Sequence, residues 1–426
     1  MYWPKLTFDK IRQKVTEALN KNVNYRQTPI LGIPATYLDP EIFYEDAPFL
    51  ENAPFLSTLI ANPNHIGIHT LTGAEKIFGG TQELEKELVR LCAEQIFGGE
   101  ENEQDGYVSS GGTEANIEAL WIYRNYFMYE QNAVIDEIAV IYSEDSHYSF
   151  AKGANLLNLQ SLVIEVDKEC RELRLGKLEE KLDDALQKGI RYFIVNMNLS
   201  TTMFGSVDDI EQVCALLSRK KINYKLHVDA AFGGFIYPFT RPENPYTFKN
   251  PDISSFTIDA HKMLQTPYGT GIFLIRKGYL KYVRTSEAQY VPGTDHTLCG
   301  SRSGANAVAV WMTLHNYGSK GWKAKMQALN DQTTDICSRL SELGIRYFRN
   351  LCMNIITLYG EDIPATIAEK YFLVADSYER EPRWWKIVVM PHITRGIIDS
   401  LITDLKLKNK EVPLTNGNSS NSKKLI

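Results

Sequence analysis

The segment YKLHVDAAFGGFIYPFTRPENPYTFKNPDISSFTIDAHKM, residues 224–263, carries the clearest fold pattern in the chain. It contains two short runs of strand-forming residues, YKLHVD (224–229) and SSFTID (254–259), and the chain between them is long enough for a helical connection. Asp229 closes the first run, and Lys262 lies just past the second. The pattern predicts strands of one sheet whose carboxyl ends carry chemically active side chains.

The same alternation of strand and helix patterns continues on both sides of this stretch. Further strands are predicted at 138–142, 161–166, 191–197 and 271–276, and helices at 113–130, 146–158, 177–188 and 207–220. This order predicts a mostly parallel α/β sheet with helices on both faces. We expect an N-terminal arm (1–60), a large domain (61–300), connecting helices with a small C-terminal α+β domain (301–407), and a disordered tail (408–426).

Composition narrows the classes of function. The 426 residues carry a net charge of −6, which argues against nucleic acid or an anionic membrane as the main partner. No apolar run is long enough for a membrane span, and the N-terminus lacks the apolar stretch of a secretory signal, so we expect a cytoplasmic protein. The six cysteines form no CxxC pair, so neither a metal site nor a redox dithiol is predicted.

The segment SSGGTEAN (109–116) is a candidate phosphate-binding loop. Its glycines let backbone N–H groups approach an anion, the helix that follows adds partial positive charge, and Thr113 adds a hydroxyl donor. The alternative is a capped helix after a turn, and the motif alone does not separate the two.

Three further side chains follow predicted strands. Asp229 closes an apolar strand, where a carboxylate needs a partner such as a protonated pyridine nitrogen. Lys262 is a candidate nucleophile toward an aldehyde. His147, in SEDSHYS (143–149), could stack on a flat cofactor. Each has a structural alternative: a turn cap for Asp229, a solvated lysine, and a hydrogen-bonded histidine. Their common place at strand ends favours one shared site.

Together these motifs resemble the group II amino-acid decarboxylases that depend on pyridoxal 5′-phosphate (PLP). The matching segments are GYVSSGGTEAN, SEDSHYS, TTMFGSVDDI, HVDAAFGGF, DAHKM, GSRSGA and WKIVVMPHIT. Some are similar to histidine and serine decarboxylases, others to archaeal-type tyrosine/aspartate decarboxylases. The resemblance implies the PLP-dependent transferase (aspartate aminotransferase, type I) fold with a seven-stranded-type sheet. It also implies a homodimer with shared active sites, and decarboxylation of an L-amino acid to CO₂ and the primary amine through an external aldimine and a quinonoid.

The resemblance also implies roles for single residues. They are Lys262 (imine with the cofactor), Asp229 (pyridine nitrogen), His147 (stacking and proton transfer), Gly112 and Thr113 (phosphate), His261 (near the phosphate), Thr201 or Thr202 (ring or its hydroxyl), Ala231 (ring face), and Gly300 with Ser301 (phosphate of the neighbouring subunit). Tyr290, in a loop that would cover the partner's site, is the candidate proton donor. Its alternative role is a packed interface aromatic.

The sequence is also compatible with other functions. An aminotransferase would use the same lysine and aspartate, with Arg395 a candidate for the substrate carboxylate. A carbon–carbon lyase, an aldehyde synthase and a non-catalytic homologue are further alternatives. The sequence leaves the substrate side chain unassigned, with Asn64, His65 and His69 as candidate contacts. The alternative role of these two histidines is structural hydrogen bonding in a turn.

Overall fold

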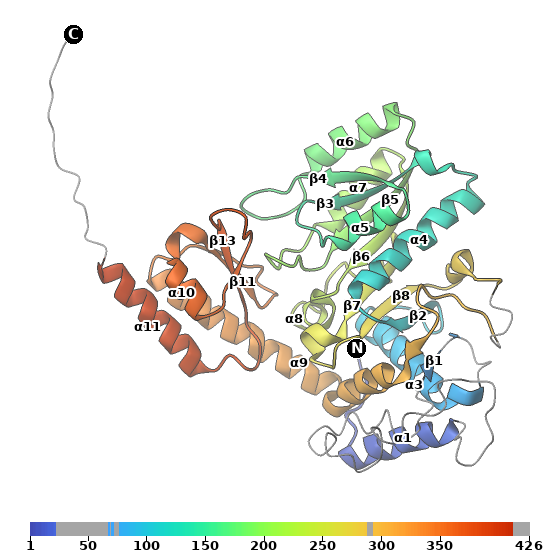
Figure 1. Cartoon of the computed structure of the whole chain (residues 1–426), viewed down its shortest axis with the longest axis horizontal. Helices are drawn as coiled ribbons and strands as arrows, with labels where there is room; N and C mark the ends of the chain where they lie inside the picture. The colour runs from blue at the N-terminus through green and yellow to red at the C-terminus, as the bar shows by residue number, and fades with distance from the viewer. Residues whose placement is uncertain (23–66, 69, 72–75, 288–292, 412–426) are drawn as a thin grey trace, which may run out of the picture. The chain divides into compact units, whose positions relative to one another are not determined.

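The computed structural model describes residues 1–22, 67–68, 70–71, 76–287 and 293–411, and Figure 1 shows their course. Asn64, His65, His69 and Tyr290 lie outside the described residues. The chain divides into two compact units, residues 1–328 and 329–426, each with its own core. No helix among the described residues is long and apolar enough to cross a membrane.

A seven-stranded sheet forms the centre of the first unit. Its strands, in spatial order, are β2 (Gln104–Ser109), β8 (Gly271–Arg276), β7 (Ile253–Asp259), β6 (Asn223–Asp229), β5 (Tyr192–Asn198), β3 (Ile138–Ser143) and β4 (Gln160–Ile164). Only β8 runs antiparallel to its neighbours, so the predicted, mostly parallel sheet is confirmed. Strand β2 was not predicted, because Gln104, Asp105 and Gly106 interrupt the apolar pattern at its start.

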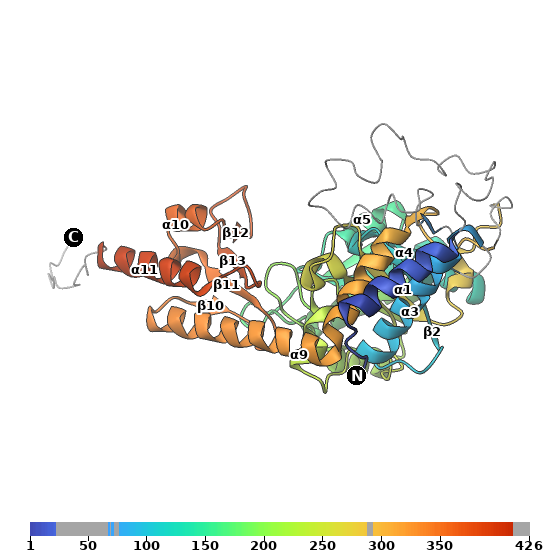
Figure 2. The ribbon, with the colours of Figure 1, turned by 90° about the horizontal axis from the view of Figure 1, so that it is seen from below.

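The first unit contains the helices α1 (Phe8–Lys21), α3 (Gly79–Arg90), α4 (Gly112–Glu130), α5 (Ser149–Leu156), α6 (Leu175–Gln187), α7 (Ile210–Arg219), α8 (Tyr237–Thr240) and the first part of α9 (Gly304–Glu342), with π-helical turns at Leu91–Ile96 and Ala260–Leu264. These helices include the four predicted ones, which are α4, α5, α6 and α7. Short 3-10 turns lie at Lys76–Phe78, Ile135–Glu137, Gly233–Phe235 and Leu280–Val283, and β1 (Gly67–Ile68) pairs with β9 (Arg302–Ser303). Helix α1 packs against α3, as Figures 1 and 2 show.

Burial shows why the central strands lie inside this unit. Every residue of β3 and of β7 is buried, which requires cover on both faces of the sheet. Helix α4 covers one of these faces, where its Leu120, Tyr123 and Phe127 are fully buried in the core. Because α4 begins directly after β2, this packing holds its first turn at the carboxyl edge of the sheet.

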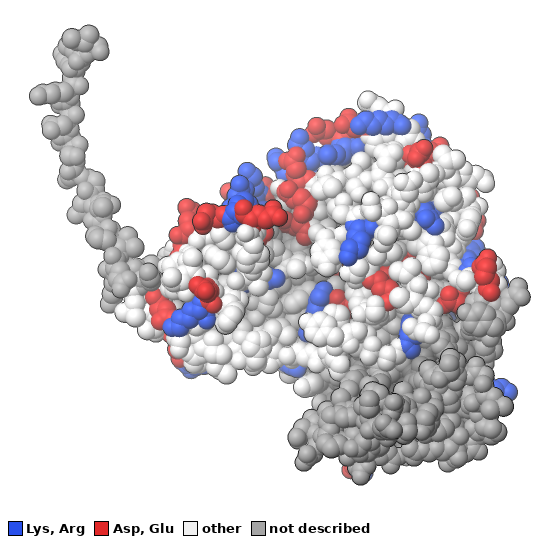
Figure 3. Space-filling model, in the orientation of Figure 1, with Lys and Arg blue, Asp and Glu red and all other residues white. Residues whose placement is uncertain are grey.

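The second unit is a small α+β structure. It contains the end of α9, β10 (Tyr347–Phe348), β11 (Ile355–Tyr359), a 3-10 turn (Gly360–Asp362), α10 (Ala365–Lys370), β12 (Val374–Ala375), β13 (Trp384–Val388) and α11 (Arg395–Glu411). Its four strands form an antiparallel sheet in the order β10-β11-β13-β12. Helix α11 extends four residues into the predicted tail (408–426), and residues 412–426 lie outside the described part. On the face drawn in Figure 3, acidic and basic side chains are interspersed.

Candidate active site

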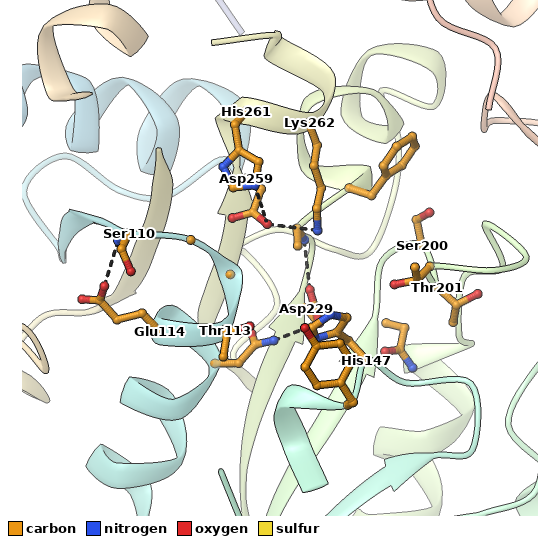
Figure 4. Close-up of a pocket in the computed structure, with 18 of the residues that line it drawn as sticks. Ser110, Thr113, Glu114, His147, Ser200, Thr201, Asp229, Asp259, His261 and Lys262 are labelled. Carbon is orange, nitrogen blue, oxygen red and sulfur yellow. Dashed lines mark hydrogen bonds and ion pairs between the residues drawn. The ribbon is translucent and has the colours of Figure 1, made fainter. Parts of the chain in front are cut away.

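A cavity of about 310 Å³ opens in the first unit at the carboxyl edge of the sheet. Strands β3, β5, β6 and β7 are parallel and end there, and β2 runs in the same direction because both β2 and β7 are antiparallel to β8. Figure 4 shows side chains from the loops after these strands converging on one space. The lining residues are Ser110, Gly111, Gly112, Thr113, Glu114, Asn116, His147, Tyr148, Asn198, Ser200, Thr201, Thr202, Asp229, Ala231, Phe232, Asp259, His261, Lys262 and Tyr268.

The turn between β2 and α4 has the shape of an anion cradle. A Cβ atom on Gly112 would lie 2.9 Å from Oδ2 of Asp259 and 3.3 Å from Cβ of Ala231, so this position is sterically restricted to glycine. The first N–H groups of a helix have no acceptor within the helix, and α4 turns these donors and its positive dipole end toward the cavity.

Glu114 anchors this turn from within the first turn of α4. Its carboxylate accepts the backbone N–H of Ser110 at 2.8 Å and the hydroxyl of Tyr107 at 3.2 Å. The two bonds tie the loop to a buried strand residue, so the loop is held in place before any anion binds.

Asp229 ends β6 as a buried carboxylate with both oxygens engaged. Oδ1 accepts the backbone N–H of Ala231 at 3.0 Å, and Oδ2 accepts the Nδ2 amide of Asn116 at 3.0 Å. These bonds hold the carboxylate in one orientation within the cavity wall, as Figure 4 shows. A carboxylate fixed in this way is suited to pair with a protonated ring nitrogen.

Lys262 lies in the π-helical turn after β7 and points into the cavity. Its ammonium Nζ is 3.0 Å from Oδ2 of Asp259, and the lysine side chain is 33% exposed while that of Asp259 is 4% exposed. The other oxygen of Asp259, Oδ1, has no hydrogen-bond partner among the described residues. The lysine is therefore reachable from the cavity, and a buried carboxylate holds its amine there.

Two histidines border the same space. His147 places Nδ1 2.9 Å from the hydroxyl of Ser149, and its ring lies against Tyr148 with centroids 4.1 Å apart. His261 stacks on Tyr268 at 5.0 Å. Burial is the main cause that lowers the pKa of both imidazoles, which keeps them neutral near pH 7.

The loop after β5 contains a buried hydroxyl without a partner. Ser200 has a φ of 88°, a region that residues with side chains rarely adopt, and its Oγ has no hydrogen-bond partner in the described part of the chain. Thr201, by contrast, bonds through Oγ1 to Ser206 Oγ at 2.7 Å. Ser200 is therefore a further candidate contact that the sequence analysis missed.

Most residues predicted for the site line this one cavity: Gly112, Thr113, His147, Thr201, Thr202, Asp229, Ala231, His261 and Lys262. Gly300 and Ser301 are exposed and are not among the lining residues. Tyr290 cannot be placed because it lies outside the described residues.

The structure also adds residues that the sequence analysis did not assign. Asp259 closes β7 as Asp229 closes β6, so its position at a strand end was a signal that could have identified it. Asn116 lies within the quoted loop motif, but a buried amide on a helix gives no sign of its partners. Tyr148 and Tyr268 became candidates only when the fold placed them beside the two histidines.

The side chains present fit PLP. Lys262 supplies an amine for its aldehyde, Asp229 a carboxylate for its ring nitrogen, and the turn at Gly112 a set of donors for its phosphate. The orphaned hydroxyl of Ser200 gives a further donor on the cavity wall. The amine, the carboxylate and the phosphate donors that PLP requires therefore all line this one cavity.

Comparisons with known proteins agree with this site. Residues 80–348 match the family model described as the pyridoxal-dependent decarboxylase conserved domain. The chain is 46% identical to tryptophan decarboxylase of Clostridium sporogenes, over 96% of this chain and 98% of that protein. It is 30% identical to a probable L-tyrosine/L-aspartate decarboxylase of Methanothrix thermoacetophila, over 87% of this chain and 94% of that one.

Among solved structures, the fold is similar to glutamate decarboxylase of Lactobacillus brevis, with a TM-score of 0.69, 18% identity, and cover of 96% of this chain and 94% of that one. The predicted fold type I architecture is thereby confirmed, and PLP is the cofactor. The chain belongs to the family of pyridoxal-dependent amino-acid decarboxylases.

Proposed function

We propose that this enzyme decarboxylates L-tryptophan, and aromatic L-amino acids more broadly, to CO₂ and the primary amine. The observation that carries the proposal is the 46% identity to a tryptophan decarboxylase along nearly the full length of both chains. The more distant tyrosine/aspartate relative, at 30% identity, leaves aromatic and acidic substrates as the two classes to separate.

The charges around the cavity favour the aromatic class. Three carboxylates line it, from Glu114, Asp229 and Asp259, and Lys262 is the single ammonium among the described lining residues. An acidic substrate side chain would meet repulsion here without a guanidinium to offset it. A neutral ring meets no such cost, and Tyr148, Phe232 and Tyr268 add aromatic surface.

The proposed roles follow from the chemistry of each side chain. PLP, when bound, supplies the electron sink for the electrons of the bond between Cα and the carboxylate. Lys262 would hold the cofactor through its side-chain amine. Asp229 would keep a proton on the ring nitrogen, and His147 would supply a donor N–H toward the reacting centre.

The remaining roles concern binding. The proposed contacts are Gly112, Thr113 and His261 (phosphate), Ala231 (ring face), Thr201 or Thr202 (ring or its hydroxyl), Gly300 and Ser301 (phosphate of the partner subunit) and Tyr290 (proton donor). Gly300 and Ser301 are exposed in the single chain, which is compatible with a contact to another chain.

We also propose that the enzyme is a homodimer with shared sites. Tyr268 is 87% exposed and Tyr148 is 65% exposed, although both border the cavity, and exposed aromatic rings are typical of surfaces that a partner covers. Light scattering on the holoenzyme would give the mass of two chains, and a monomer with full activity would contradict the proposal. The cytoplasmic location stays a prediction.

A substrate panel tests the activity. The holoenzyme is incubated with L-tryptophan, L-phenylalanine, L-tyrosine, L-aspartate, L-glutamate or L-histidine, and CO₂ and amine are measured. We expect the highest kcat/KM for L-tryptophan and equal amounts of CO₂ and tryptamine. Faster turnover of L-aspartate or L-glutamate would contradict the substrate class. A stoichiometric keto acid would indicate an aminotransferase, and peroxide with ammonia an aldehyde synthase.

A further inference from the structure

Six polar side chains form one continuous chain of hydrogen bonds that runs from the cavity wall into the sheet. The members are Tyr123 and Asn116 on α4, Ser255 on β7, His227 on β6, and His147 and Ser149 at the start of α5. Asn116 lies at the branch point, where the chain also reaches Asp229.

The acceptor nature of Asp229 fixes the amide of Asn116. A carboxylate only accepts hydrogen bonds, so the atom that lies 3.0 Å from Asp229 Oδ2 is Nδ2 of Asn116. Oδ1 of the amide then points toward His227, whose Nε2 lies 3.0 Å away. Because an amide oxygen only accepts, His227 must carry its proton on Nε2.

The rest of the His227 branch agrees with this assignment. Full burial lowers the pKa of His227 to about 4, so its ring is neutral and Nδ1 is an acceptor. Ser255 Oγ lies 2.7 Å from Nδ1 and donates to it, while Tyr123 donates its hydroxyl to Ser255. Thr257 Oγ1, which lies 3.2 Å from Nε2, accepts a share of the same N–H, so every group in this branch has one consistent direction of donation.

The other branch runs toward the cavity. The second N–H of Asn116 Nδ2 donates to Ser149 Oγ at 2.9 Å, which leaves the serine hydroxyl proton free to be donated to His147 Nδ1 at 2.9 Å. The backbone N–H of Ser149 also points at Nδ1, at 3.3 Å. With Nδ1 accepting, neutral His147 carries its proton on Nε2.

We propose that Asn116 is a positioning residue whose single amide orients Asp229 and, through Ser149, sets the proton on Nε2 of His147. The inference rests on the proposed function, since it concerns the same cofactor site. It assigns one residue to two tasks: presenting a carboxylate to the ring nitrogen and presenting a donor N–H on the ring face. Both tasks depend on an amide, which donates twice and accepts once, and neither aspartate nor leucine at this position offers that set of groups.

Other charges around His147 keep their hydrogen bonds in Ser149→Ala, the variant that tests the branch to His147. They are Asp229 from β6, Asp259 and Lys262 from the end of β7, and Lys152 from α5. A change in the titration of His147 is therefore attributable to the hydrogen bonds that are removed.

Two variants separate the branches. Ser149→Ala removes the hydroxyl donor to His147 and leaves the bond between Asn116 and Asp229. The lost hydrogen bond stabilises the neutral form of His147, so its removal makes His147 easier to protonate. In a plot of kcat against pH, the acid limb, where activity is lost as the pH falls, should therefore move to higher pH by about 0.5 unit or more. The dissociation constant of PLP, measured by absorbance, stays within about twofold. Ser149→Thr, which keeps the hydroxyl, restores the limb.

Asn116→Ala removes the amide that joins both branches. Ser149 keeps its hydroxyl but loses the donor that directs the hydroxyl proton to His147, so we expect the acid limb to move up by no more than in Ser149→Ala. Because a buried carboxylate oxygen of Asp229 loses its donor, the PLP dissociation constant should rise about 10-fold. The matched control is Asn125→Ala. It changes another buried asparagine of α4, which donates to the carbonyl of Tyr282 at 2.7 Å away from the cavity. We expect this control to leave the acid limb of the plot of kcat against pH and the PLP affinity unchanged.

Each outcome decides the proposal. Wild-type values for both measurements in Asn116→Ala overturn it, and a change in PLP affinity alone shows that the amide serves Asp229 only. If Asn116→Ala fails to fold, Ser149→Ala decides: a shifted acid limb supports the relay, and an unshifted limb overturns it. Failure of the proposed function is seen separately, as absence of a cofactor absorbance band or of CO₂ release in the wild-type enzyme.

Discussion

Asp229 and Asp259 occupy equivalent places at the ends of neighbouring parallel strands, yet their surroundings differ. Both are buried, and both line the cavity. Asp229 receives two hydrogen bonds from neutral donors and is held rigidly. Asp259 faces the ammonium of Lys262 at 3.0 Å, and its second oxygen has no partner in the described part of the chain.

This difference separates two kinds of buried carboxylate. Neutral donors fix the orientation of a carboxylate without neutralising it. A carboxylate that pairs with a protonated ring nitrogen, as proposed for Asp229, needs both properties. The carboxylate of Asp259 is instead paired with Lys262, the residue whose amine would hold the cofactor. Asp229 is thus fixed by an amide and a backbone N–H that keep their places, whereas Asp259 depends on a reactive side chain.

The comparison predicts unequal effects for two matched substitutions. Asp229→Asn removes the negative charge that holds a proton on the ring nitrogen, so we expect kcat/KM to fall by about 10³-fold. Asp259→Asn, at the next strand end, keeps an acceptor for Lys262 and lowers kcat/KM by less than about 10-fold. Steady-state kinetics of the two holoenzymes check this, and equal losses would break the comparison.

A smaller effect is expected from Gly112→Ala, which pushes a methyl group against Asp259. The added Cβ would meet Asp259 Oδ2 at 2.9 Å and Ala231 Cβ at 3.3 Å, so the loop must shift by a few tenths of an ångström. Crowding of this kind costs about 1–2 kcal/mol, which predicts a PLP dissociation constant raised about 10-fold.

Gly176→Ala serves as the control for this variant. Gly176 lies in helix α6, and a Cβ atom there would meet nothing within 4 Å. PLP titration of the apo forms gives the comparison. An unchanged affinity in Gly112→Ala would show that the turn does not contact the phosphate.

A separate prediction concerns stability and pH at His227, two residues before Asp229. Burial lowers its folded-state pKa from 6.5 to about 4. Below about pH 6.5 the unfolded chain takes up a proton that the folded chain refuses until about pH 4, so stability falls as pH falls through this window. Linkage sets the loss at about 3 kcal/mol in total.

His227→Gln removes this contribution, so its melting temperature should fall less than that of the wild type between pH 7.5 and 5. The exposed His392, changed to Gln, is the control and retains the wild-type pH dependence. Parallel melting curves for wild type and His227→Gln would contradict a neutral, buried His227.

Much of the fold followed from local patterns. Six of the seven strands of the main sheet were predicted because each is a short apolar run beside a helix pattern. The missed strand, β2, begins with Gln104 and Asp105 and is recognisable only through its pairing with β8. Pairing between distant segments leaves no trace in the sequence of either segment alone.

The sequence predicted site residues whose position in a motif implied their chemistry, as for Lys262, Asp229 and His147. It did not predict Asn116, because the partners of its side chain, His227 and Asp229, lie more than a hundred positions away in the sequence. Ser200 was missed because backbone strain and an unpaired hydroxyl are properties of the folded loop.

Borohydride reduction of the holoenzyme, followed by digestion and mass spectrometry, shows which lysine binds PLP. We expect that reduction removes the visible absorbance band and leaves a phosphopyridoxyl group on the peptide that contains Lys262. A label on another lysine, or a reduced protein without a label, would contradict the claim that Lys262, beside Asp259 and across the cavity from the α4 turn, holds the cofactor.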